Sequence, residues 1–350
     1  MPSVKTLSRP MTTASARAAA EPIFAKALKA LHAKNHAKAQ RLFRECIKAD
    51  RTWFAAWCNL GAALFDAGRY DEALKPLETA RQLAPDSGPV RFNLAQALLM
   101  LGRWREGFAE YRERLGGDPS HAERRIGGWV RWQGERLAGR TLVVLAEQGM
   151  GDIIMFARFL PMLPRDGGRI ILECPAPLQP LFAAFPGVDQ VVNQGQPLDP
   201  AYLRVPLGDL PALVGADIDN VSPVAPYLRA DLAETAKWAE RLAAICTPGR
   251  CRVGLIWQGN PAQPCEPERS ISLRRLEPLL SRPDLSLVSL QRDHGLEQLD
   301  QLPDAIRPAS LGPEFRHFGD TAAVMANLDL IVTTCTGPAH LAGALGRPTW

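Results

Sequence analysis

The 350-residue sequence predicts a helical repeat region followed by two α/β lobes, each built on a parallel sheet. Three observations indicate this α plus α/β fold class. The first third repeats with a period of 34 residues, the spacing from Leu60 to Leu94. After residue 140, apolar runs of strand length alternate with helical segments. The alternation then starts afresh near residue 231, which favours a second lobe.

The repeat rests on residues of matching type one period apart, and its units are expected at 20–53, 54–87 and 88–121. Residues 1–19 are expected to form a disordered tail. A weaker first unit is indicated by Ala39 and Phe43, one period before Ala73 and Leu77. The clearest matches pair Leu60, Leu64, Gly68, Tyr70 and Pro85 with Leu94, Leu98, Gly102, Trp104 and Pro119.

Each unit reads as two antiparallel helices that meet through alternating small and large residues. Gly61 and Ala73 suit a close approach, whereas Trp57 and Leu77 fill the space between helices. This pattern resembles the tetratricopeptide repeat (TPR), whose stacks usually bind peptides or proteins on a concave face. We therefore expect a protein or polysaccharide partner at the repeats, while a structural spacer or a dimer surface stays open as the alternative.

Composition limits the function classes. Hydrophobic residues make up 46% and charged residues 22%, as in ordinary globular proteins. The net charge of +4 suits an anionic ligand and is too small to indicate nucleic acid binding. The seven cysteines form no C-x-x-C pair, so neither a disulfide framework nor a zinc site is predicted. No apolar run reaches the roughly 20 residues of a transmembrane segment, and a cytoplasmic location is expected.

The first α/β lobe is predicted at 137–230, after a linker at 122–136. Its strands are expected at 141–146, 169–172 and 188–192, with helices at 153–163 and 177–185 between them. The second lobe is predicted at 231–350, and a cleft is expected between the two lobes. Its strands are expected at 252–257, 285–288 and 328–332, with helices at 231–245, 273–280, 321–326 and 337–345 and a further strand beginning at Pro348.

The first candidate site lies between strand 141–146 and the next helix, at Gln148, Gly149, Gly151 and Asp152. A dinucleotide fingerprint would need a third glycine where Ile154 stands, so a nicotinamide-dependent dehydrogenase is disfavoured. The glycines suit the close approach of another backbone or of an acceptor. Asp152, at the helix start, is suited either to cap the helix or to act as a general base.

Two further sites follow strands of the second lobe. Gly259 and Asn260 lie in a loop after strand 252–257, and with the cation Arg269 they could hold a diphosphate. Thr336 and Gly337 open a helix after strand 328–332, a position suited to phosphate. His340, in the first turn of that helix, faces either a ligand or the core, and its spacing alone favours a packed histidine.

These sites, in this order, resemble the two-lobe (GT-B) glycosyltransferases related to bacterial lipopolysaccharide heptosyltransferases, and in particular the TPR-fused members of that group. The resemblance covers about 130–350. It is carried by Glu147–Asp152, Gly254–Asn260, Asp320–Ala323 and Thr336–Gly346.

The resemblance implies that a nucleotide sugar, and no further cofactor, occupies the second lobe. Gly259, Asn260 and Arg269, with Thr336, Gly337 and His340, would bind the donor and stabilise its leaving diphosphate without a metal. Asp152 would be the catalytic base, and Gln148, Gly149 and Gly151 would form the acceptor-side loop. The D-x-D at Asp217 is interpreted as a loop and not as a metal site.

Two departures from the family support an alternative. Cys335 stands where the family usually has an aspartate, and the sequence ends at Trp350 where the family continues, so the second lobe is expected to be incomplete. The alternative function is a non-catalytic TPR interaction module with a degenerate or truncated transferase domain. The TPR fusion also resembles O-linked N-acetylglucosaminyltransferases, and no residue identifies the sugar, the nucleotide or the acceptor.

Overall fold

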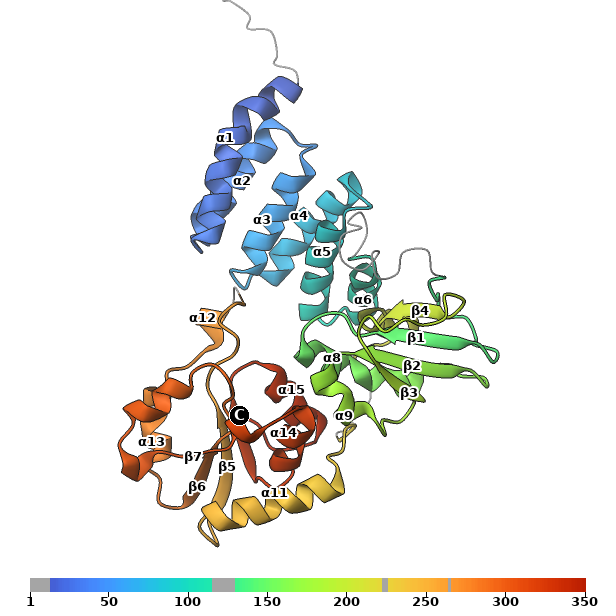
Figure 1. Ribbon diagram of the computed structural model, residues 1–350. Helices are drawn as coiled ribbons and strands as arrows, with labels where there is room; N and C mark the ends of the chain where they lie inside the picture. Colours follow the sequence, from blue (N-terminus) through green and yellow to red (C-terminus); the bar gives the residue numbers. More distant parts are fainter. Residues whose placement is uncertain (1–12, 115–129, 222–225, 264–265) are drawn as a thin grey trace, which may run out of the picture. The chain divides into compact units, whose positions relative to one another are not determined.

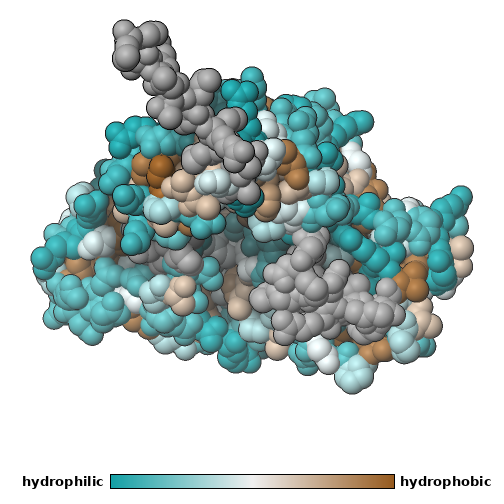
Figure 2. All heavy atoms as spheres, turned by 90° about the horizontal axis from the view of Figure 1, so that it is seen from above, coloured by the Kyte–Doolittle hydropathy of each residue, from teal (hydrophilic) through white to brown (hydrophobic). Residues whose placement is uncertain are grey.

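The computed structural model describes residues 13–114, 130–221, 226–263 and 266–350. These residues form two compact units, shown in Figure 1. The helical unit comprises the repeats together with Pro211–Val221, and the α/β unit comprises the other described residues from 130 onward. Figure 2 shows a mainly hydrophilic face on which hydrophobic residues form small separate patches, as is usual for protein surfaces.

The helical unit consists of paired helices, as the repeat predicts. Gly68 and Gly102 adopt φ angles of 73° and 75° in the turns between paired helices, which a side chain would disfavour. The first helix begins at Thr13, inside the stretch expected as a tail, and the end of the third unit at 115–121 lies outside the described residues. The helices are α1 (Thr13–His32), α2 (His36–Ala49), α3 (Phe54–Phe65), α4 (Tyr70–Leu83), α5 (Gly88–Met100) and α6 (Trp104–Arg112).

Close packing in this unit depends on the small residues of the repeat. A Cβ placed on Gly61 would lie 2.4 Å from Cγ of Leu77, so α3 and α4 can approach only because position 61 is glycine. The buried amide of Gln40 adds a polar link, because its Nε2 donates to the carbonyl of Ala63 and its Oε1 accepts from Arg69, both at 3.0 Å. The repeats are therefore held by interdigitated apolar side chains and by satisfied buried polar groups.

The α/β unit contains two four-stranded parallel sheets. The first has the order β3-β2-β1-β4, with Thr141 opposite Arg169 and Leu142 opposite Leu203 in its register. Sequence reasoning missed β4, because the fully buried Arg204 interrupts its apolar run. The strands of the first sheet are β1 (Thr141–Leu145), β2 (Arg169–Cys174), β3 (Gln190–Asn193) and β4 (Leu203–Pro206).

The helices beside the first sheet differ from the prediction. The helix expected at 153–163 begins earlier, as α8 (Met150–Phe156), and continues as a 3-10 segment, Ala157–Met162, that contains Pro161. The helix expected at 177–185 is a 3-10 turn followed by the short α9 (Gln179–Phe182). Prolines lack the amide hydrogen that continues an α-helix, which explains why both helices are shorter and irregular.

The second sheet has the order β7-β6-β5-β8. Its strands are β5 (Cys251–Ile256), β6 (Leu285–Ser289), β7 (Ala309–Ser310) and β8 (Leu330–Thr333), and β7 is too short to have been predicted. The chain from Pro348 pairs with β8, since Ile331 donates to the carbonyl of Pro348 at 2.9 Å. The helices are α11 (Leu232–Ile245), α12 (Glu266–Arg269), α13 (Glu277–Leu280), α14 (Phe318–Met325) and α15 (Gly337–Ala344), with the short α10 (Leu210–Leu213) following β4.

Two connecting segments, residues 130–132 of the expected linker and the loop at Asp217, pack against neighbouring elements. Within the expected linker, Trp132 is fully buried and donates its backbone N–H to the carbonyl of Arg204, so residues 130–132 run beside β4. Asp217 lies in a loop of the helical unit and pairs with Arg105 at 2.6 Å.

Among the described residues, no three metal-ligating side chains gather at one place. No helix in the described part of the chain has the length and apolar composition needed to cross a bilayer.

Candidate functional site

A cavity of about 810 Å³ lies in the α/β unit, outside the carboxyl ends of β1, β5, β6 and β8. Ligands of parallel α/β proteins bind at such strand ends, because the connecting loops gather there. The structure brings all ten predicted site residues to this cavity: Asp152, Gly259, Asn260, Arg269, Thr336, Gly337, His340, Gln148, Gly149 and Gly151. Their chemical roles remain predictions.

The loop after β1 leads directly into α8. Gly149 is the N-cap residue, and its N–H donates to Oδ2 of Asp152 at 3.2 Å. Asp152 is thus the third residue of the helix, and the interpretation of this aspartate as the N-cap itself is wrong. Its carboxylate instead reaches back to the cap, as in a capping box. This hydrogen bond fixes the side chain at the edge of the cavity.

The second glycine of this loop allows two helices to meet. A Cβ on Gly151 would lie 2.7 Å from Cδ2 of His340 and 3.2 Å from Cα of Gly337. The first turns of α8 and α15 therefore pack directly against each other, and any side chain at position 151 would separate them. Of the two uses considered for the glycines, the structure shows the close approach of another backbone.

The start of α15 offers backbone donors to the cavity. Thr336 is the N-cap residue, as expected, but its hydroxyl donates to the carbonyl of Thr334 at 3.3 Å and makes no cap bond to the helix. Pro338 lies in the first turn, where its missing N–H costs nothing. The positive end of the helix dipole at this place favours an anionic ligand.

His340 both packs against Gly151 and lines the cavity. Burial lowers the pKa of His340 below its ordinary value of 6.5, while the carboxylate of Asp152 opposes this shift and the cation of Arg158 adds to it. The imidazole is consequently neutral at pH 7 in the unliganded protein. A neutral imidazole can donate one hydrogen bond and accept another.

The depressed pKa of His340 predicts a pH dependence of stability. The unfolded chain binds a proton at this histidine near pH 6.5, whereas the folded chain resists it. We therefore expect stability to be fully present above about pH 7.5 and to fall as the pH drops towards about 5.5. Urea unfolding across this range checks the slope. His340→Gln should flatten it and His32→Gln, at an exposed histidine of α1, should not; equal slopes in both variants would refute the assignment.

The loop after β5 meets the start of α15 through Arg269. This residue ends α12, and its Nη1 donates to the carbonyl of Cys335 at 3.0 Å. The guanidinium is thereby placed next to Thr336 and Gly337. Asn260 has a local role, because its Oδ1 accepts the N–H of Ala262 at 2.9 Å and shapes the loop. A cation, glycine backbone and a helix start thus gather on one side of the cavity.

Sequence reasoning missed the contribution of the loop after β6. Gln291, Arg292 and His294 line the cavity, and Gln291 is only 2% exposed. The available signal was their position directly after a predicted strand, at the same sheet edge as the other sites. Arg292 adds a second guanidinium to the lining, and Asp293, which also lines the cavity at 3.5 Å from Arg292, offsets its charge.

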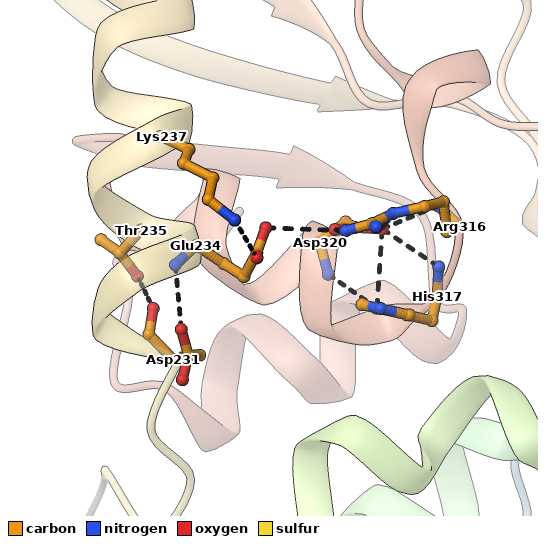
Figure 3. A network of polar contacts seen from close by, with 7 residues as sticks. All are labelled: Asp231, Glu234, Thr235, Lys237, Arg316, His317 and Asp320. Carbon is orange, nitrogen blue, oxygen red and sulfur yellow. Dashed lines mark hydrogen bonds and ion pairs between the residues drawn. The ribbon is translucent and has the colours of Figure 1, made fainter.

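The motif residue Asp320 stabilises the start of α14 (Figure 3). Its buried carboxylate accepts from the backbone N–H and the guanidinium of Arg316, at 2.8 and 3.0 Å. Burial by itself would raise the pKa of Asp320, but these hydrogen bonds and the nearby His317 hold the pKa below its ordinary value. The network positions α14, from which Phe318 and Thr321 reach the cavity lining.

Glu234 of α11 extends this network, since it lies 3.6 Å from the guanidinium of Arg316 and pairs with Lys237 (Figure 3). Asp231 caps α11 by accepting the N–H of Glu234 at 2.9 Å. The network therefore joins α11 to α14 on the side of the second sheet. Asp320 acts in the packing of these helices, and it is not among the residues that line the cavity.

Comparison with known proteins divides the chain in the same way. Residues 64–110 match the model of the tetratricopeptide repeat, and residues 281–349 match that of glycosyltransferase family 9 (heptosyltransferase). Protein FlbA of Caulobacter vibrioides is 29% identical over 332 residues, which cover 87% of this chain and 55% of FlbA. The chain thus spans about half the length of this curated relative.

Two solved structures are similar to part of this chain. The family 9 glycosyl transferase from Veillonella parvula is 15% identical, with a TM-score of 0.49, over 62% of this chain and 81% of that chain. The ADP-heptose lipopolysaccharide heptosyltransferase II of E. coli is 16% identical, with a TM-score of 0.45, over 60% of this chain and 83% of that chain.

Proposed function

We propose that this chain, which joins tetratricopeptide repeats to a segment of the heptosyltransferase-related glycosyltransferase family 9, transfers a sugar from a nucleoside-diphosphate donor to a hydroxyl group. The observation that supports this proposal is the convergence of Asp152, Arg269 and the start of α15 on one cavity. In the proposal, the two sheets are the acceptor and donor lobes of a GT-B transferase. The family matches support glycosyl transfer in general. The nucleoside-diphosphate donor and the acceptor hydroxyl are what we propose in addition.

The donor diphosphate would lie on the side of the second sheet. The guanidinium of Arg269 and the backbone amides from Thr336 onward would bind its phosphate oxygens. As the bond from the sugar carbon to the phosphate oxygen breaks, the electron pair stays on the diphosphate, and these fixed positive groups stabilise the added charge. No metal is required in this mechanism.

The acceptor would enter beside the loop Gln148–Asp152. Its hydroxyl oxygen attacks the sugar carbon, and the hydroxyl proton passes to the carboxylate of Asp152. Gly151 lets α8 contact α15, because a Cβ at this position would meet His340 and Gly337. In this proposal, Asp152 thus acts on the attacking hydroxyl, and the diphosphate-binding groups act on the leaving diphosphate.

The repeats would bind the protein or polysaccharide that carries the acceptor hydroxyl. Tetratricopeptide stacks expose an extended concave surface suited to a chain-like ligand. A second candidate function is supported by Cys335, which has an exposed thiol where related transferases carry an aspartate. In that case the α/β unit would bind a nucleotide without turnover, and the repeats would supply the function.

A thermal-shift panel of nucleoside diphosphates and nucleotide sugars tests this proposal. A donor at 100 times its Kd should stabilise the protein by about 2.7 kcal/mol, which raises Tm by a few degrees. The nucleotide found in this way is then used in a transfer assay. Binding with transfer supports the enzyme, binding without transfer supports the second candidate, and the absence of any shift in a cooperatively melting protein contradicts both.

A further inference from the structure

The buried amide of Gln291 joins two loops that line the cavity. Its Oε1 accepts the backbone N–H groups of Trp257 and Gln258, at 3.0 and 3.1 Å. Its Nε2 donates to the carbonyls of Gln258 and His294, at 2.8 and 2.6 Å. All the hydrogen-bonding capacity of this amide is therefore spent on the backbone of the loops after β5 and β6.

Only an amide of this length can make this set of bonds. A carboxylate accepts but cannot donate, and an apolar side chain does neither. The backbone of Gln291 packs closely against Gly312, where a Cβ would lie only 1.8 Å from the carbonyl oxygen of Gln291. From this closely packed backbone, the side chain extends to both loops.

Neighbouring contacts support the same junction. The indole Nε1 of Trp257 donates to the carbonyl of Gly295 at 3.3 Å, which is a second bond from the β5 loop to the β6 loop. The side chain of Gln258 accepts from Nε2 of Gln298 at 3.0 Å. Gly259 and Asn260 directly follow Trp257 and Gln258 in the loop after β5. Arg292 and His294 follow Gln291 in the loop after β6, and all four line the cavity.

We propose that Gln291 is a positioning residue that holds the loops after β5 and β6 in register, so that their cavity-facing groups bind the nucleotide donor together. It acts through the backbone of both loops and does not take part in the chemical step. The statement about the donor rests on the proposed function, whereas the coupling of the two loops does not.

The physical reason is the cost of leaving buried groups unpaired. Without the amide, two backbone N–H groups and two carbonyls beside the cavity lose their partners, and each would seek water or another partner. The loops would then separate or change conformation. The charge that develops on the diphosphate is assigned to Arg269 and the start of α15, and the loops after β5 and β6 are expected to hold the donor equally before and during the reaction. Loss of their positioning should therefore raise KM for the donor and leave kcat nearly unchanged.

The test compares Gln291→Glu and the apolar Gln291→Met with the wild-type chain. Amide hydrogen exchange should become faster at 257–260 and at 292–295 together, while the β5 amides stay protected. Donor KM should rise about tenfold or more, with kcat within about threefold and acceptor KM unchanged. Gln40→Glu and Gln40→Met are matched controls, because Gln40 is a similarly buried amide (4% exposed) in the helical unit.

The exchange and kinetic results distinguish a failure of the loop coupling from a failure of the proposed function. Exchange that changes in only one loop, or in neither, overturns the coupling whether or not a nucleotide binds. A variant with faster exchange in both loops but donor KM within about twofold of wild type shows a purely structural role and overturns the positioning role. If the wild-type chain binds no nucleotide, the positioning of a donor fails together with the proposed function, and the exchange data still decide the coupling.

Discussion

Asp152→Asn is expected to reduce kcat for sugar transfer by about 10²–10⁴-fold while donor binding stays within about twofold of wild type. The amide has the size of the carboxylate and can still accept the N–H of Gly149, so the start of α8 should be preserved. It cannot take the proton of the acceptor hydroxyl at neutral pH. The expected result is thus a protein that folds, binds the nucleotide and fails to turn over.

Single-turnover kinetics and a donor titration check this prediction. Asp231→Asn is the matched control, because Asp231 caps α11 in the same unit and asparagine caps a helix equally well. That variant should keep wild-type rates. Retained turnover in Asp152→Asn would contradict the role of base, and a lost affinity for the donor would assign Asp152 to nucleotide binding instead.

Gly312→Ala is expected to destabilise the α/β unit by about 3 kcal/mol, at the upper end of overpacking costs. The added Cβ would lie 1.8 Å from the backbone oxygen of Gln291, 2.5 Å from its carbonyl carbon and 3.1 Å from the nitrogen of Arg292. These are backbone atoms of a segment tied to two loops, so the clash cannot be relieved by rotating one side chain. The loops beside the cavity should shift with it.

Urea unfolding measures the change in the free energy of unfolding. Gly343→Ala is the control, and it is expected to stabilise the protein. A Cβ on Gly343 would meet no atom within 4 Å, and this glycine lies inside α15. Alanine there should stabilise the protein by about 0.5–1 kcal/mol through helix propensity. A Gly312→Ala variant within about 0.5 kcal/mol of wild type would show that the segment around Gln291 is free to move.

The strands that the sequence predicted best are those whose apolar runs are continuous. The runs around 141–146 and 252–257 are buried on both faces of parallel sheets, and each gives a strand within one residue of its expected bounds. Strand β4 was missed because its buried Arg204 looks like a surface residue. Its guanidinium donates to the carbonyls of Leu198 and Asp199, and the carboxylate of Glu173, far away in the sequence, favours its charge.

The site shows the same division between local and distant information. Each predicted group follows a strand, and parallel strands end at one sheet edge, so the sequence could indicate that these groups gather. It could not show that Gly151 faces His340 or that Arg269 reaches the carbonyl of Cys335, because both contacts join segments far apart in the chain. The role of Gln291 was invisible for the same reason.

The claim that the cavity binds a nucleoside diphosphate is tested most directly by calorimetric titration of the wild-type chain and of Arg269→Ala. The nucleotide with the largest thermal shift is the ligand. We expect one site in the wild-type chain and an affinity at least about tenfold lower in the variant, which lacks the charge-assisted bonds to phosphate. No binding to the wild-type chain, or the same Kd in both proteins, would contradict the proposed donor site.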